Sequence, residues 1–176
     1  TGCTNNLVQG SSFETSTDMT YWTVLTNEPG GSIFRVDNPY AICGSQYGYI
    51  RATDPSHNPA YLVTVYQNIV ATAGTTYSLS VNAGTHDPTQ DQLIKLEFYD
   101  AANNLLSGGQ SVQVDTDVDI APATLGTYNL TATAPMGTAF VRVTASTQGI
   151  YTTENTALKF DCFCLTATAA TTCSSS

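Results

Sequence analysis

The chain has 176 residues, and 5 Lys and Arg against 14 Asp and Glu give it a formal net charge of −9. This acidity argues against binding to nucleic acids, whose phosphates attract basic surfaces. A chain of this length usually forms one domain with its own core. No apolar run approaches the roughly 20 residues that a membrane-spanning helix needs, so we expect no membrane insertion.

The composition is typical of a secreted β protein. Only 11% of the residues are charged, whereas 41% are hydrophobic. Thr, Ser, Asn and Gly take the place of charged residues, and β-branched Thr suits exposed sheet faces. Five cysteines in such a chain favour an oxidising compartment. We therefore expect a secreted or cell-surface protein.

Two-residue alternation of apolar and polar side chains predicts β-strands, and no segment has the pattern of a long amphipathic helix. In chain order the alternation covers residues 50–52, 62–66, 77–81, 93–99, 128–132 and 141–143. Turn clusters separate these runs, which is typical of an all-β jelly-roll β-sandwich of two antiparallel sheets. We predict a single jelly-roll domain over residues 1–165 and a Ser/Thr-rich C-terminal extension or linker over residues 166–176.

Scarce cations inside the predicted strands suggest a ligand-binding face. Arg51 and Arg142 alternate with apolar residues, and tyrosines such as Tyr49 and Tyr99 point to the same side. If these strands share one sheet, they form a face that suits an oligosaccharide. Aromatic rings pack on sugars, and polar side chains with two hydrogen-bonding groups bind their hydroxyls. The candidate ligand-binding residues are Tyr49, Arg51, Gln67, Glu97, Tyr99 and Arg142. The other interpretation is a solvated sheet face with cross-strand ion pairs.

A second possible location is the loop tips. The tyrosines near turn clusters are Tyr40, Tyr47, Tyr61 and Tyr151. The sequence does not choose between the sheet face and the loop tips.

Motifs for catalysis are missing from the sequence. The two histidines, His57 and His86, lie in separate loops, and no nucleophile, metalloprotease or zinc motif is present. The acidic ladder Asp115, Asp117 and Asp119 also fails as an EF-hand loop. It is either a solvated strand face or a Ca²⁺-binding loop of another type. We predict that the protein is not an enzyme.

Segments at both ends of the chain carry a family resemblance. The opening Asn6–Glu14, followed by Trp22, and the closing Phe160–Leu165 resemble the first and last motifs of jelly-roll carbohydrate-binding modules of families 4, 9 and 22, in the galactose-binding-like superfamily. Segments between them follow in the expected order. The resemblance spans residues 6–165 and implies a jelly-roll fold, a glycan ligand and a core position for Trp22.

The resemblance also implies a structural calcium ion. In these modules a Glu of the first motif, an Asp of the last strand and backbone carbonyls hold Ca²⁺, which prefers oxygen ligands. Glu14 and Asp161 take those two places by resemblance. The other interpretation is two unrelated surface acids.

The five cysteines allow two disulfides. Cys43 lies just before a strand and can reach Cys162 or Cys164, while Cys3 and Cys173 can join the two ends of the chain. The sequence does not fix the pairing, and one cysteine is left for a bond between copies.

Two functions follow from these observations. The first is a non-catalytic extracellular carbohydrate-binding or adhesion module with a structural calcium site, whose partner is an oligosaccharide or cell-surface glycan. The second is a structural subunit or repeat of an extracellular fibre, surface layer or large adhesin, joined to copies of itself through its termini. The tyrosines and arginines favour the first, and the low charge and odd cysteine favour the second.

Overall fold

The computed structural model describes residues 2–27, 33–37, 39–51, 62–89, 91–148 and 157–170, apart from the side chain of Phe34. These residues form one short helix and ten strands. The elements are α1 (Ser16–Met19), β1 (Thr23–Thr26), β2 (Ile33–Asp37), β3 (Gln46–Arg51), β4 (Leu62–Val70), β5 (Thr76–Thr85), β6 (Asp91–Tyr99), β7 (Gln110–Gln113), β8 (Gly126–Thr133), β9 (Phe140–Gln148) and β10 (Ala157–Thr168). No helix in the described part of the chain is long and apolar enough to cross a membrane.

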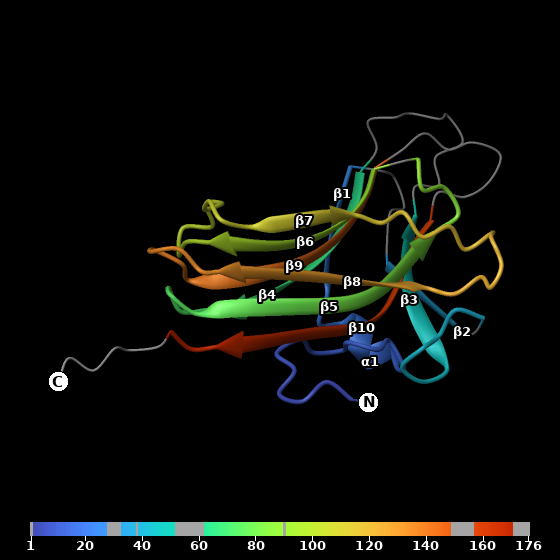
Figure 1. The fold of residues 1–176 in the computed structure, drawn as a ribbon, viewed down its shortest axis with the longest axis horizontal. Coiled ribbons are helices and arrows are strands. Elements are labelled where there is room, and N and C mark those ends of the chain that lie inside the picture. The colour runs from blue at the N-terminus through green and yellow to red at the C-terminus, as the bar shows by residue number, and fades with distance from the viewer. Residues whose placement is uncertain are drawn as a thin grey trace.

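The strands form two five-stranded sheets that pack as layers (Figure 1). The β9 sheet has the order β1-β4-β9-β6-β7, and the β10 sheet has the order β2-β3-β10-β5-β8. All neighbouring strands are antiparallel, and many neighbours come from distant parts of the chain. The predicted all-β jelly-roll sandwich is confirmed.

The hydrophobic core lies between the two layers and follows the two-residue alternation of the strands. Ile94, Leu96 and Phe98 of β6 are fully buried, and so are Leu158 and Phe160 of β10. Burying a side chain of this size contributes about 1.5–3 kcal/mol. The residues between them point to the outer faces of the sheets, where a ligand can reach them.

The N-terminal segment runs along β10 without forming a regular strand. The Leu7 N–H donates to the Leu165 carbonyl (2.9 Å), and the Phe163 N–H donates to the Ser11 carbonyl (3.0 Å). Trp22 is 5% exposed, and its ring centre lies 4.8 Å from that of Phe163. The core position predicted for Trp22 is confirmed.

The last strand runs past the domain end predicted at residue 165. Thr166, Ala167 and Thr168 pair with β5. Residues 169 and 170 follow this strand, and residues 171–176 lie outside the described residues.

Two disulfides link β10 to earlier parts of the chain. Cys43 bonds to Cys162, which is one of its two predicted partners. Cys3 bonds to Cys164, so the predicted pairing of Cys3 with Cys173 is wrong. The physical reason is that the N-terminal segment runs along β10 and brings Cys3 beside Cys164. Cys173 lies outside the described residues.

Candidate functional site

The predicted ligand-binding residues are divided between the two sheets. Tyr49 and Arg51 lie on β3 in the β10 sheet, whereas Glu97, Tyr99 and Arg142 lie on β6 and β9 in the β9 sheet. The condition that these strands share one sheet is therefore not met. Alternation predicts on which face of its strand each side chain lies, but it does not reveal which strands pair.

Arg142, on the outer face of the β9 sheet, is enclosed by its neighbours. Its guanidinium carbon lies 4.1 Å from the ring centre of Tyr66 and 3.9 Å from that of Tyr99. Its Nε donates to Asn68 Oδ1 (2.8 Å), and one terminal nitrogen donates to Asn103 Oδ1 (3.0 Å). The arginine thus covers ring faces that a sugar would need. This cluster offers a ligand few open faces and few free donors.

Gln67 faces the interior and binds the N-terminal segment. Its side chain is 8% exposed. The Gln9 N–H donates to Gln67 Oε1 (2.8 Å), and Gln67 Nε2 donates to the Gln9 carbonyl (2.9 Å). Both ends of the amide are therefore used within the protein.

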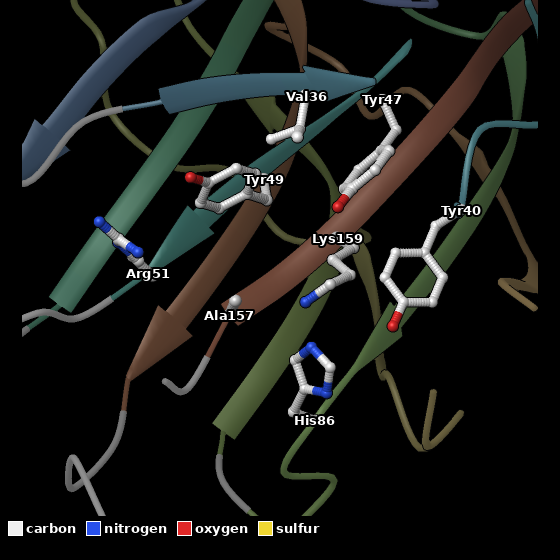
Figure 2. A pocket seen from close by; sticks show the side chains of 8 residues that line it. All are labelled: Val36, Tyr40, Tyr47, Tyr49, Arg51, His86, Ala157 and Lys159. Atoms are coloured by element: carbon white, nitrogen blue, oxygen red, sulfur yellow. The ribbon is translucent and has the colours of Figure 1, made fainter. Parts of the chain in front are cut away.

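A pocket of about 270 Å³ opens on the outer face of the β10 sheet near its β2 edge. Figure 2 shows the side chains around it, which come from β2, β3, β10 and two loops: Val36, Tyr40, Tyr47, Tyr49, Arg51, His86, Ala157 and Lys159. The pocket thus combines the two locations that the sequence left open, because Tyr49 and Arg51 belong to a sheet face and Tyr40 belongs to a loop. Tyr61, Tyr151 and His57 lie outside the described residues.

Three tyrosines line the pocket and contact one another. The ring centres of Tyr40 and Tyr47 are 5.5 Å apart, and those of Tyr47 and Tyr49 are 6.4 Å apart. Burial raises the pKa of Tyr47 to about 12. Its hydroxyl therefore stays protonated at neutral pH and can both donate and accept a hydrogen bond.

Lys159 brings a positive charge into this pocket from the middle of β10. Its neighbours Leu158 and Phe160 point into the core, so alternation directs Lys159 to the outer face. The residue is 5% exposed, and Figure 2 shows its ammonium pointing into the hollow. Burial lowers the pKa of Lys159 to about 8, while the charge of Asp119 acts in the opposite direction.

His86, in the loop after β5, also borders the pocket. Its Nδ1 lies 2.6 Å from Asp119 Oδ1, and its ring centre lies 6.2 Å from that of Tyr40. Asp119, one residue of the predicted acidic ladder, thus has the imidazole as its partner. This contact orients His86 towards the tyrosines.

Glu14 binds the turn that precedes β3. Its Oε1 accepts the backbone N–H groups of Gln46 (2.8 Å) and Ser45 (3.0 Å). The hydrogen bond from Gln46 lowers the pKa of Glu14. Gly44 in this turn has a φ of +120°, and a Cβ there would collide with the Glu14 carboxylate. A glycine is therefore required for this close approach.

Asp161 binds the same turn from β10. Its Oδ2 accepts the N–H groups of Ile42 (2.7 Å) and Cys43 (2.8 Å), and its Oδ1 accepts that of Cys162 (2.8 Å). The residue has no exposed area. Burial raises the pKa of Asp161, although these hydrogen bonds act in the opposite direction.

The surroundings of Glu14 and Asp161 do not fit a calcium ion. Ca²⁺ needs about 6–8 oxygen ligands, whereas these carboxylates face N–H donors, whose dipoles repel a cation. Among the described residues, the only group of three or more His, Cys, Asp or Glu side chains whose ligand atoms could hold a metal ion together is Cys43, Asp161 and Cys162. Its two sulfurs are joined in a disulfide. Calcium binding stays a prediction from the resemblance.

Comparison with known sequences identifies one family, whose pattern matches residues 32–165. The chain belongs to this family, described as a domain of unknown function, DUF7850. No curated protein matches this DUF7850 chain.

Several solved structures have the fold of the DUF7850 chain. The structure of TmCBM61 in complex with β-1,4-galactotriose has a TM-score of 0.60 and 16% identity, and covers 93% of this chain and 99% of its own. The CBM22-1 xylan-binding domain from Paenibacillus barcinonensis Xyn10C has a TM-score of 0.61 and 14% identity, and covers 97% of this chain and 99% of its own. The predicted resemblance to jelly-roll carbohydrate-binding modules is confirmed at the level of the fold.

The same fold occurs within a larger phage protein. The enzymatically active domain of tailspike protein 4 from bacteriophage CBA120 has a TM-score of 0.68 and 16% identity, and 93% of the DUF7850 chain is covered. The match spans 21% of the tailspike chain. Identities this low show a common fold, and the ligand must be argued from the site.

Lys159 is the pocket residue that sequence reasoning missed. The signal was present, since Lys159 is a cation between two apolar residues of the closing strand, as Arg51 is in its own strand. Tyr47 was a loop-tip candidate and His86 was noted only as a loop residue, because nothing local places either of them beside Lys159.

Proposed function

We propose that this DUF7850 domain is a carbohydrate-binding module whose site is the pocket in Figure 2. The observation that supports this is the group of three adjoining tyrosines beside Lys159 on an outer sheet face. Sugars are bound by aromatic rings that pack on their C–H surfaces and by polar groups that bind their hydroxyls. Two structures with the same fold are described as carbohydrate-binding modules.

The proposed setting is extracellular, with the glycan on another molecule or on a cell surface. Both disulfides require an oxidising compartment in most organisms. The module is proposed to act by binding alone, without catalysis.

The first experiment compares one tyrosine from each outer face. Tyr49→Ala removes a ring from the pocket, whereas the control Tyr66→Ala removes a ring from the opposite sheet. Glycan-array screening of the native protein identifies a ligand, and calorimetry then measures its affinity for each variant. We expect Tyr49→Ala to weaken binding about tenfold and Tyr66→Ala to leave it unchanged.

Two results would contradict this proposal. Equal losses of glycan affinity in both variants would show that the pocket is not the binding site. A protein that binds no glycan and polymerises, as measured by light scattering, would instead support the structural subunit that the sequence also suggested.

A further inference from the structure

Lys159 has a largely buried side chain whose ammonium points into the pocket (Figure 2). Its side chain lies 5% exposed on β10, and none of the described residues accepts a hydrogen bond from its ammonium. The described contact is with Tyr40, whose ring centre lies 5.5 Å from Nζ. An ammonium has three donors, so Lys159 can donate to an acceptor that enters the pocket.

Arg142 shows that the same chain can satisfy a strand cation internally. Two tyrosine rings and the side-chain oxygens of Asn68 and Asn103 surround its guanidinium. Lys159 has no such set among the described residues. The difference distinguishes a cation that stabilises the protein from one that is open to a ligand.

The charged side chains among the described residues that line the pocket are basic, in an otherwise acidic protein. Two of the chain's five Lys and Arg residues, Arg51 and Lys159, line it, and His86 adds a third basic group. Within the described part of the chain, no carboxylate lines the pocket. The nearby Asp119 is held by His86 at 2.6 Å. Such a site favours an anion over a neutral ligand.

We propose that the pocket binds a sugar residue that carries a carboxylate, with Lys159 as the partner of that carboxylate. This inference rests on the proposed function and names its ligand class. The adjoining rings of Tyr40, Tyr47 and Tyr49 provide apolar surface for the sugar, which a bare anion would not need. The volume of about 270 Å³ lies just below the range of roughly 300–1,000 Å³ for drug-sized ligands, so the pocket takes one residue of a glycan.

The test uses pairs of ligands that differ only in charge. Oligosaccharides ending in glucuronate, galacturonate or sialic acid are each compared by calorimetry with their methyl esters, using the native protein. We expect at least one acid to bind about tenfold or more tightly than its ester, because a charge-assisted hydrogen bond is lost on esterification. Added salt is expected to narrow the difference. This comparison does not depend on the folding of any variant.

Three variants then test whether the preference for the acid depends on Lys159. Lys159→Met is expected to abolish the preference for the acid over its ester. The matched control Lys95→Met, on the β9 sheet, is expected to preserve the preference. Thermal unfolding checks that both variants are folded, and Lys159→Arg, which keeps the charge, is expected to keep the preference.

The outcomes separate this inference from the proposed function. Esters or neutral glycans that bind as well as the acids would overturn the carboxylate but leave a carbohydrate-binding module. A preference for sulfated oligosaccharides alone would also overturn it, as would an acid preference that survives in Lys159→Met. Binding to no glycan at all would overturn both proposals.

Discussion

Lys159 carries a cost in stability that follows from its position in the pocket. Its pKa falls to about 8 because burial disfavours the charged ammonium. At neutral pH the folded protein therefore holds a charge that would be better solvated in the unfolded chain. A residue of this kind is retained more readily for binding than for stability.

The pH dependence of stability tests whether the buried charge of Lys159 destabilises the folded protein. Below about pH 8 Lys159 is charged in both states, so the full cost of burial is present. Between about 8 and 10.5 the folded state loses its proton first, and stability contributed by this group rises with pH. We expect Lys159→Met to stabilise the protein at pH 7 by about 2–3 kcal/mol and the gain to shrink near pH 10. Thermal unfolding at both pH values measures it, and a gain that is independent of pH would contradict the titration.

At the scale of elements, the turn between β2 and β3 positions the pocket. Glu14 and Asp161 bind its backbone N–H groups, and the Cys43–Cys162 disulfide fixes it to β10. This turn lies between Tyr40 and Tyr47 in the chain. The carboxylates and the disulfide thus hold two of the three pocket tyrosines in place.

The same contacts lead to a prediction about calcium. Because N–H donors face both carboxylates, we expect thermal unfolding to give the same Tm with EDTA and with excess CaCl₂. A rise of Tm with Ca²⁺ that disappears in Glu14→Gln would instead support the calcium site implied by the resemblance. It would require the turn at residues 42–46 to rearrange and present oxygen ligands.

Alternation of apolar and polar residues predicted strands at β4, β5, β6 and β8, but it did not predict β10 or the partners of any strand. Residues 93–99, for example, alternate over their whole length, and all of them lie in strand β6 (Asp91–Tyr99). The four-residue strands β1 and β7 are too short to show a period. Sheet membership depends on long-range pairing, so the sequence could not tell whether Tyr49 and Tyr99 share a sheet, and they lie on opposite sheets. The pocket was predictable only in part, through Tyr49 and Arg51 on the predicted face and Tyr40 and Tyr47 among the loop-tip candidates.

At the scale of the whole molecule, β10 connects stability with binding. It lies at the centre of its sheet between β3 and β5 and carries Lys159 on its outer face. It also contributes one cysteine to each of the two disulfides. Cys3–Cys164 ties down the N-terminal segment, which Leu7 and Gln67 also hold. Cys43–Cys162 ties down the turn beside the pocket. The two bridges therefore differ in what they position.

Removing each disulfide separates these roles. The bridges span 161 and 119 residues, so chain entropy predicts a similar loss of about 2–5 kcal/mol for Cys3→Ser with Cys164→Ser and for Cys43→Ser with Cys162→Ser. Only the second pair releases the turn next to Tyr40 and Tyr47, because neither Cys3 nor Cys164 lies in that turn or lines the pocket. We expect denaturant unfolding to show comparable destabilisation and calorimetry to show lost glycan affinity in the second pair alone. Equal affinity in both pairs would mean that Glu14 and Asp161 hold the turn without the disulfide.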